Sequence, residues 1–338
     1  MINLSIILPM YNVAGYLEKC VKSVMNTNLG GDSFEIIFVD DESPDNSKIV
    51  AKDIIKRYPE YNFKLISQTN KGLGGARNTG IDNAEGDYLI FLDPDDFIVD
   101  NNLEETLQNA KSNNLDILEF NATMVNSKGE TIQTVKVNSY EKILSGIIYS
   151  NLFYCSGSAC NKLYSRGFLN QFDLRFMEKV YGEDFEFNTR VFFHASRVKG
   201  LNKVVSAFLQ SPNSITRNRD IDKKIKYLKD YIKILTNLKS YFSNIEVNQT
   251  SDAIIYYKSR MALINTNSFI LLIKNKFPTD YALQYRKRLE NDDLLFITSE
   301  IVIKKKNLVR KFLFQYQGMF FIVFKLNNII KGTIKLPL

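Results

Sequence analysis

The sequence has few cysteines, one histidine and no long run of apolar residues. Its three cysteines, Cys20, Cys155 and Cys160, lack the spacing of a metal site, and a sparse odd set is typical of reduced thiols in a cytoplasm. The longest apolar runs, such as 319–324, fall far short of the roughly 20 residues that span a bilayer. The N-terminus, MINLSIILPMYN, lacks the basic segment of a signal peptide. These absences favour a cytoplasmic protein, and we expect His194 to be a structural residue on a helix.

Acidic residues are missing from the C-terminal end, because none follows Glu300. Residues 1–117 contain 10 Lys/Arg and 19 Asp/Glu, a net charge of −9, and the whole chain carries +7, so the remainder carries +16. The basic residues of the C-terminal end are Lys304, Lys305, Lys306, Arg310, Lys311, Lys325, Lys331 and Lys335.

These cations alternate with Phe, Leu, Ile and Val, which predicts amphipathic helices over 301–338 that bind an anionic membrane surface peripherally. The alternative is a helical appendage that packs on the core or on a second subunit, and the oligomeric state stays open. Binding to nucleic acid is not expected, because the basic excess lies far from any recognised nucleic-acid motif.

Strand patterns alternate with helix patterns through the first 122 residues, in a chain of ordinary globular composition. Such alternation predicts a doubly wound, mostly parallel α/β sheet. The pattern becomes irregular over 123–215 and helical beyond residue 222. We therefore expect two domains, a catalytic one over 1–217 and a mostly helical one over 218–338. The expected strands are 4–9, 34–41, 63–67, 87–92 and 115–122.

The segment YLIFLDPDDFIV, residues 88–99, places Asp93, Asp95 and Asp96 directly after a buried strand. The second strand likewise ends in Asp40 and Asp41. Ligands bind beyond the carboxyl ends of strands in open α/β sheets, where like charges repel unless a cation neutralises them. Oxygen ligands favour Mg²⁺ or Mn²⁺, and Mg²⁺ shares its shell with substrate phosphates. The segment therefore predicts a metal–diphosphate site, the alternative being a solvated turn and helix cap.

Five segments occur in the order and spacing of one enzyme family: SIILPMYN, FVDDESPDNS, NKGLGGARNTGI, GDYLIFLDPDD and YGEDFEF. Over about residues 3–217 the chain resembles inverting glycosyltransferases of family 2, which have a GT-A fold. Two positions depart mildly: Glu42 stands where the family often has glycine, and Gly75 where a small residue such as alanine is common. The resemblance implies a nucleotide-sugar donor, here expected to be a UDP-sugar, and a glycan or lipid-linked glycan acceptor in surface polysaccharide synthesis.

The resemblance also assigns roles around the nucleotide. Pro9 and Tyr11 would line the base pocket. Asp41, alone or together with Asp40, would accept a hydrogen bond from the base. Asp95 would contact Mn²⁺ or Mg²⁺ directly, with Asp93 toward the ribose or the metal, and Asp96 would cap a helix. The residues expected around ribose and diphosphate are Asn70, Gly72 and Arg77.

Inversion needs a base on the face of the sugar opposite the leaving group. By the family's E-D motif this base is Asp184, supported by Glu183, whereas in the alternative these residues and Glu186 only flank a helix start. A loop would close over the diphosphate and two residues would orient the acceptor, although plain structural turns explain both stretches equally well. The loop residues are Ser214, Thr216 and Arg217, and the acceptor residues are Asn161 and Lys162.

Two other functions are compatible with a nucleotide-binding α/β domain. A nucleotidylyltransferase would need a Gly-rich, basic signature directly after the first strand, where this chain has PMYNVAGY. A catalytically inactive nucleotide-sugar-binding partner would not need Asp93, Asp95 and Asp184, all of which are present. The sequence therefore favours the glycosyltransferase.

Overall fold

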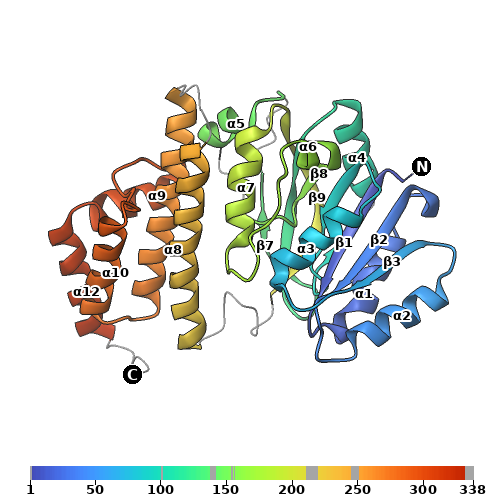
Figure 1. Ribbon diagram of the computed structural model, residues 1–338, viewed down its shortest axis with the longest axis horizontal. Coiled ribbons are helices and arrows are strands. Elements are labelled where there is room, and N and C mark those ends of the chain that lie inside the picture. The colour runs from blue at the N-terminus through green and yellow to red at the C-terminus, as the bar shows by residue number, and fades with distance from the viewer. Residues whose placement is uncertain are drawn as a thin grey trace. The chain divides into compact units, whose positions relative to one another are not determined.

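The computed structural model describes residues 2–99, 102–137, 142–153, 155, 157–210, 220–244 and 251–331 (Figure 1). The chain forms two compact units. One comprises Met1–Tyr149 and Cys155–Ser214, and the other comprises Ser150–Tyr154 and Ile215–Leu338. The assignment of catalysis to residues 1–217 stays a prediction.

The first unit is a mixed sheet with helices on both faces. Its strand order is β3-β2-β1-β4-β8-β6-β9-β5, and β7 pairs with β6. β3, β2, β1 and β4 are parallel, whereas β8 joins β4 and β6 in antiparallel register. The expected doubly wound α/β fold is therefore confirmed, with antiparallel strands added beside the parallel half. The strands are β1 (Leu4–Met10), β2 (Phe34–Asp40), β3 (Asn62–Ser67), β4 (Tyr88–Phe91), β5 (Phe97–Ile98), β6 (Ile117–Val125), β7 (Thr131–Val135), β8 (Lys162–Ser165) and β9 (Val198–Leu209).

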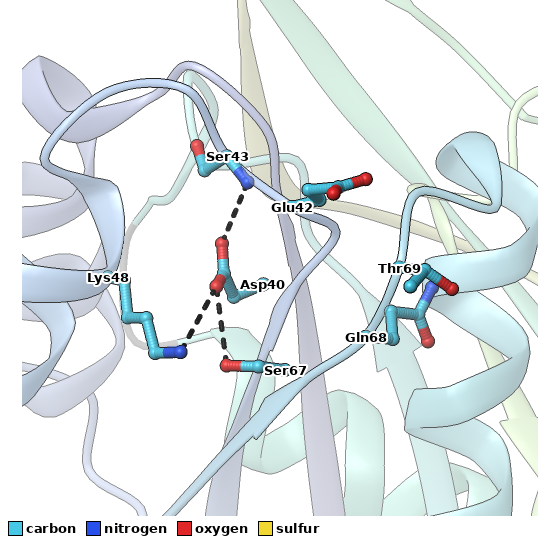
Figure 2. A pocket seen from close by; sticks show the side chains of 7 residues that line it. All are labelled: Asp40, Glu42, Ser43, Lys48, Ser67, Gln68 and Thr69. Atoms are coloured by element: carbon cyan, nitrogen blue, oxygen red, sulfur yellow. Dashed lines mark hydrogen bonds and ion pairs between the residues drawn. The ribbon is translucent and has the colours of Figure 1, made fainter.

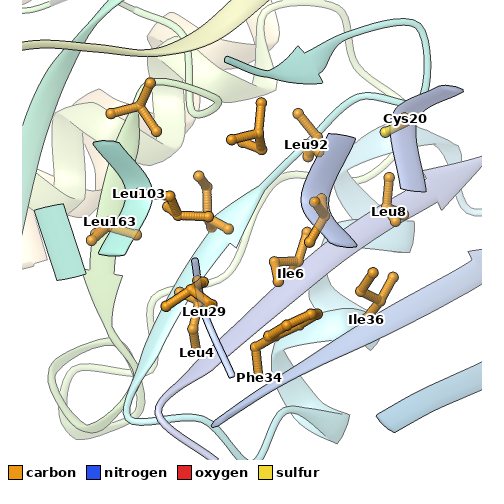
Figure 3. Packing of buried hydrophobic residues seen from close by; sticks show 14 of the residues in the cluster. Leu4, Ile6, Leu8, Cys20, Leu29, Phe34, Ile36, Leu92, Leu103 and Leu163 are labelled. Atoms are coloured by element: carbon orange, nitrogen blue, oxygen red, sulfur yellow. The ribbon is translucent and has the colours of Figure 1, made fainter. Parts of the chain in front are cut away.

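Alternation along β1 divides the core between the two faces of the sheet. Leu4, Ile6 and Leu8 belong to a buried cluster that α1, α2 and α4 cover (Figure 3). Ile7 faces the other way, toward α3. Each fully buried side chain of this kind stabilises the fold by about 1.5–3 kcal/mol. The helices of this unit are α1 (Ala14–Met25), η1 (Gly31–Ser33), α2 (Ser47–Arg57), α3 (Gly72–Asn83), α4 (Asn102–Ser112), α5 (Gly146–Leu152, which continues into the second unit), α6 (Arg166–Gln171) and α7 (Glu183–His194).

The Gly-rich segment after β3 is helical from its first residue, rather than a turn that leads into a helix. Its glycines let α3 lie close to its neighbours. A Cβ on Gly80 would lie 2.3 Å from Ile7 Cγ2, and one on Gly74 would lie 2.2 Å from the Met177 carbonyl oxygen. Gly72 has φ +77°, a conformation that L side chains rarely adopt. The glycines therefore fix α3 against β1 and against the segment before α7.

The second unit is helical. Leu228, Leu235 and Leu238 are buried along α8, and Met261 and Leu272 are buried along α9. Among the described residues, the structure contains no helix with the length and apolar content needed to cross a membrane. The helices of this unit are α8 (Ile221–Asn244), α9 (Ser251–Lys274), α10 (Thr279–Asn291), α11 (Lys304–Val309), the π-helical turn η2 (Arg310–Phe314) and α12 (Gln317–Lys331).

Candidate active site

The carboxyl ends of the parallel strands meet at one edge of the sheet, and a pocket opens between the ends of β2 and β3 (Figure 2). Its volume of about 450 Å³ lies in the range of small-molecule sites. The Ser43 amide donates to Asp40 Oδ1 at 3.1 Å, and Ser67 Oγ donates to Asp40 Oδ2 at 3.3 Å. Lys48 Nζ lies 3.8 Å from the same oxygen. The pocket is lined by Asp40, Glu42, Ser43, Lys48, Ser67, Gln68 and Thr69.

A second depression, of about 520 Å³, includes Asn3 and Ser33, which precede β1 and β2. It therefore lies at the amino ends of these strands. Ligands of open α/β sheets bind at the carboxyl ends. The pocket beside Asp40 is accordingly the better candidate for a nucleotide.

Asp41 fixes the chain that leads into α3. Gln68 Nε2 and the Lys71 amide donate to its Oδ1 at 2.7 and 2.8 Å, and Asn70 Nδ2 donates to its carbonyl oxygen at 3.1 Å. The Asp41 side chain is buried, and Oδ1 already accepts two hydrogen bonds. The structure thus places Asp41 and Asn70 in contact, while Asp40 is the aspartate that lines the pocket.

The backbone at residue 42 gives a reason for one departure from the family pattern. Glu42 has φ +59°, in the left-handed region that glycine adopts without steric cost. Its carboxylate accepts a hydrogen bond from the Asn70 amide at 3.1 Å. The glutamate therefore keeps the glycine-like turn and adds a contact to the loop before α3.

The end of β1 exposes one aromatic ring. Pro9 is buried within the strand, whereas 53% of Tyr11 is exposed. The following residue, Asn12, has φ +57°, and its amide donates to Ser43 Oγ at 2.8 Å. The Tyr11 ring is thus exposed at the carboxyl end of β1, while Pro9 belongs to the buried strand.

Arg77, in α3, gathers three carboxylates around one buried guanidinium. Nη2 donates to Asp93 Oδ1 at 2.9 Å, and Nη1 donates to Glu183 Oε1 at 2.9 Å and to Asp184 Oδ1 at 2.5 Å. Only 1% of Arg77 is exposed. The guanidinium therefore joins the acidic segment after β4 to the first turn of α7, rather than reaching into open solvent.

Aromatic rings pack against this guanidinium. Arg77 Cζ lies 5.3 Å from the centre of the Phe176 ring, which stacks on Phe187 at 3.8 Å. Cys160 Sγ, a free thiol, lies 3.7 Å from Nη2. Apolar walls strengthen charge interactions because they exclude water. Residues 160 and 176 carry no charge, and their contacts with Arg77 reveal their part in the site.

Burial opposes ionisation of the carboxylates in this network. It raises the pKa of Asp184, against the opposing effect of Arg77. Burial, followed by the charge of Asp184, raises the pKa of Glu183 as well. An aspartate with a raised pKa is a stronger base near neutral pH than an exposed one.

Asp184 lies in the first turn of α7, after Gly182, which has φ +90°. Its second oxygen, Oδ2, accepts a hydrogen bond from the Ala159 amide at 3.0 Å. A carboxylate has about four lone-pair positions, so each oxygen keeps room for another donor. The side chain is 22% exposed, whereas that of Glu183 is 9% exposed. Asp184 is therefore the more accessible of the two acidic residues.

Burial and neighbouring charge also affect the aspartates of the acidic segment after β4. Burial and the neighbouring Asp93 together raise the pKa of Asp95 to about 6. Asp96 Oδ1 accepts a hydrogen bond from the Leu209 amide at 2.8 Å, and β5 follows directly. The expected helix cap at Asp96 is thus wrong, since this carboxylate ties the segment to the end of β9.

The residues of this segment fit a cation shared with substrate. Among the described residues, no group of three or more His, Cys, Asp and Glu side chains could hold a metal ion alone. Mg²⁺ in phosphate-binding enzymes uses one or two carboxylates and completes its shell with phosphates and water. Asp95 and Asp93 supply that number. Burial, followed by the charge of Asp93, raises the pKa of Asp95, and a cation bound beside it would favour the ionised carboxylate.

Other residues that the sequence singled out are buried or paired within the fold. Asn161 and Lys162 are fully buried, and Lys162 Nζ contacts Glu119 Oε1 at 3.2 Å. Glu186 forms a buried ion pair with Arg190 at 2.6 Å. His194, expected to be structural on a helix, ends α7, and its ring stacks on Phe172 at 4.4 Å.

The structure therefore brings Asp93, Arg77, Glu183 and Asp184 into one cluster and leaves Asn161 and Lys162 beneath the surface. The three expected loop residues lie outside the described residues, and they are Ser214, Thr216 and Arg217. Sequence reasoning missed the pocket residues Ser43, Lys48 and Gln68, whose positions just after β2 and β3 were the available signal.

A solved structure shares the fold. Residues 1–349 of S. aureus TarS, in a crystal structure in complex with UDP-GlcNAc, superpose with a TM-score of 0.69 at 19% identity. The superposition covers 99% of this chain and 93% of that chain. The fold and the acidic carboxyl edge define the class: this is a protein of the GT-A type.

Sequence comparison then gives the family. The family described as glycosyl transferase family 2 matches residues 5–172, and the chain belongs to it. The uncharacterized glycosyltransferase EpsJ of Bacillus subtilis is 32% identical over 63% of this chain and 62% of its own length. The minor teichoic acid biosynthesis protein GgaB of the same species is 38% identical over 34% of this chain and 13% of its own. The chain thus spans less than two thirds of these curated relatives.

Proposed function

We propose that this protein is an inverting glycosyltransferase that moves a sugar from a UDP-sugar to a hydroxyl group of a glycan or lipid-linked glycan. The observation that carries the proposal is the contact of Arg77 with both Asp93 and Asp184. Asp93 belongs to the acidic segment expected to hold the donor, and Asp184 is the expected base. Transfer needs these two functions side by side, because the base and the leaving group act on opposite faces of one sugar.

The proposed donor site is the carboxyl edge of β1, β2 and β3. Its pocket of about 450 Å³ offers hydroxyl, amide and charged groups, and the exposed Tyr11 ring offers a stacking surface. Asp41, or Asp40 in the pocket, would accept the hydrogen bond of the base, with Asn70 and Gly72 toward ribose and diphosphate. Arg77 is buried, and it would orient Asp93 and Asp184 instead of binding the diphosphate itself. The UDP-GlcNAc of the TarS structure supports a UDP-sugar.

We propose a surface glycan as the acceptor, in agreement with the teichoic acid biosynthesis named for GgaB. Buried Asn161 and Lys162 would act indirectly. Lys162 Nζ donates to Asn161 Oδ1, and Lys162 Nζ and Asn188 Nδ2 both donate to the Ser158 carbonyl next to Ala159. Ala159 in turn donates to Asp184. These residues would set the position of the base rather than touch the acceptor.

Mn²⁺ or Mg²⁺ would be held by Asp95, assisted by Asp93, and would stabilise the charge of the departing diphosphate as a Lewis acid. Asp184 would take the proton from the acceptor hydroxyl as that oxygen attacks the anomeric carbon. Its hydrogen bonds to Arg77 and Ala159 hold the carboxylate in one orientation. Burial raises its pKa, which makes it a better proton acceptor than an exposed aspartate.

The test is release of the nucleoside diphosphate from a panel of UDP-, GDP- and dTDP-sugars with glycan acceptors, for the parent and for Asp184→Asn. The variant cannot accept a proton near neutral pH, so transfer should fall about 10²–10⁴-fold while UDP affinity stays within a few fold. The parental rate should fall as the pH drops through the raised pKa of Asp184, and the variant should lack this dependence.

Three outcomes separate the alternatives. Release of pyrophosphate from UTP and a sugar 1-phosphate, with no UDP release from the UDP-sugars, would identify a nucleotidylyltransferase. Tight binding of a UDP-sugar without turnover by the parent would identify an inactive binding partner. Parental transfer by Asp184→Asn would contradict the assignment of the base and move the search to Glu183.

A further inference from the structure

The outer surface of the last helices is apolar, which is the reverse of an ordinary surface helix. We define the C-terminal apolar face as the exposed large apolar side chains of residues 308–330. Ile329 and Ile330 are 70% and 76% exposed. Met319, Ile322, Leu326 and Ile329 follow one another at spacings of three and four residues, so they form one stripe along α12. The face consists of Leu308, Phe312, Tyr316, Met319, Phe321, Ile322, Leu326, Ile329 and Ile330.

The opposite side of the same helices is already packed within the second unit. Phe320 and Phe324 are buried, and the Phe320 ring lies 4.9 Å from that of Phe269 in α9. Arg286 Nη1 donates to the Phe314 carbonyl at 2.5 Å, and Arg310 Nη1 donates to the Ile297 carbonyl at 2.6 Å. The inner side of these helices is therefore buried in the second unit, whereas the side chains of the C-terminal apolar face remain exposed.

The charges on the segment that carries the face have one sign. Exposed Lys304, Lys305, Lys311 and Lys325 accompany it, and no acidic residue occurs after Glu300. Lys325 Nζ lies 5.7 Å from the centre of the Phe321 ring, so one ammonium borders an exposed aromatic residue directly. A two-fold interface between copies would place these lysines against their own equivalents. The charge pattern therefore argues for an anionic occupant and against a second copy.

We propose that the C-terminal apolar face inserts into the surface of an anionic phospholipid bilayer, with these lysines at the level of the head groups. Apolar side chains on one face and lysines beside it are the features of helices that lie in the membrane interface. No described helix can cross the bilayer, so the attachment is to one leaflet. Membrane binding by this face does not depend on the transfer reaction. Only its purpose, access to a lipid-linked acceptor, rests on the proposed function.

The experiment uses the absence of tryptophan from the chain. Leu326→Trp places a single reporter on the face, and Ile132→Trp places a matched one at an exposed isoleucine of β7 in the first unit. With vesicles of phosphatidylcholine and phosphatidylglycerol, the emission of Leu326→Trp should shift to the blue and be quenched by brominated acyl chains. The emission of Ile132→Trp should change in neither respect.

Co-sedimentation of the full chain with the same vesicles then tests the apolar side chains and the lysines separately. Ile322→Ser combined with Ile329→Ser should weaken binding at least about tenfold, because both side chains leave the apolar stripe. Lys304→Gln with Lys305→Gln should weaken binding several-fold for each lysine removed, and added salt should have the same effect. Ile132→Ser is the control and should bind as the parent does.

Other outcomes overturn the proposal. Absence of parental binding to these vesicles, or unchanged binding by Ile322→Ser with Ile329→Ser, rules out insertion. Concentration-dependent dimers that this double variant loses would instead identify a second copy as the occupant. Release of UDP from a free UDP-sugar in solution, without vesicles, should be the same in parent and double variant. Failure of membrane binding is thereby distinguished from failure of the proposed transfer activity.

Discussion

Arg77→Met tests whether the guanidinium holds the candidate site together. Arg77 is 1% exposed and faces Asp93, Glu183 and Asp184, and methionine replaces it with an uncharged, flexible side chain. Removal of one partner from a buried ion pair costs about 3–5 kcal/mol, because it leaves uncompensated buried charge. For a unit of this size, that corresponds to a melting temperature lower by about 6–20 °C.

The loss of stability in Arg77→Met should increase with pH. Burial already raises the pKa of Glu183 and Asp184 above their ordinary values, and removal of Arg77 raises both further. A group whose pKa is raised in the folded state stabilises that state below the unfolded pKa, and this contribution is lost as the pH rises through the folded pKa. The deficit of the variant relative to the parent should therefore be small near about pH 5 and larger near about pH 8.

Thermal and urea unfolding at both pH values measure this difference. Arg57→Met is the matched control, because Arg57 also contacts two carboxylates, Glu18 at 2.5 Å and Asp53 at 2.8 Å, but with its side chain 38% exposed. Exposed pairs contribute about 0–1 kcal/mol, so the control should lose little at either pH. Equal losses in the two variants, or a pH-independent loss in Arg77→Met, would refute the reasoning.

Two further predictions concern the donor site. Asp95→Ala should remove most of the effect of Mn²⁺ or Mg²⁺ on UDP affinity, as measured by calorimetric titration with and without the metal. An unchanged metal dependence would contradict the cation assignment. Asp41→Ala should weaken nucleotide binding and reduce the preference for uridine over other bases in the same titrations. Equal weakening for every nucleotide would instead indicate that Asp41 only supports the loop, and Asp40→Ala would then be expected to change the base preference.

The parallel half of the fold was predictable because its strands are apolar runs, two of which are followed directly by aspartates. The boundaries of β1, β2 and β3 agree with the expected strands to within about one residue. Their parallel arrangement follows from the helices between them. The position of the acidic segments at one edge could therefore be anticipated before any contact was known.

The region over 123–215 was not predictable, for a physical reason. β8 is four residues long and buried on both sides of the sheet, so its pattern does not alternate. β9 pairs with β6 through shifts of register, which interrupt the period of two that reveals a strand. These strands are defined by their partners, and a single sequence does not show which partners they have.

The same limit applies to Arg77. Its place beside glycines suggested a ligand for phosphate, whereas its contacts with Asp93 and Asp184 join positions 16 and 107 residues away. Its guanidinium also lies beside the Phe176 ring, and Phe176 carries no sequence signal for a site. Contacts over such separations are a property of the completed fold.

The position of β9 affects synthesis of the chain on the ribosome. β9 pairs with β6 and with β5, yet it begins at Val198, beyond the residue 172 at which the family match ends. Until it emerges, one side of β6 has no partner, and an unpaired strand edge is a template for association with other chains. Arg77 likewise lacks two of its carboxylate partners until residues 183 and 184 have been synthesised. A nascent chain that ends near residue 172 therefore leaves this edge of β6 open to association with other chains.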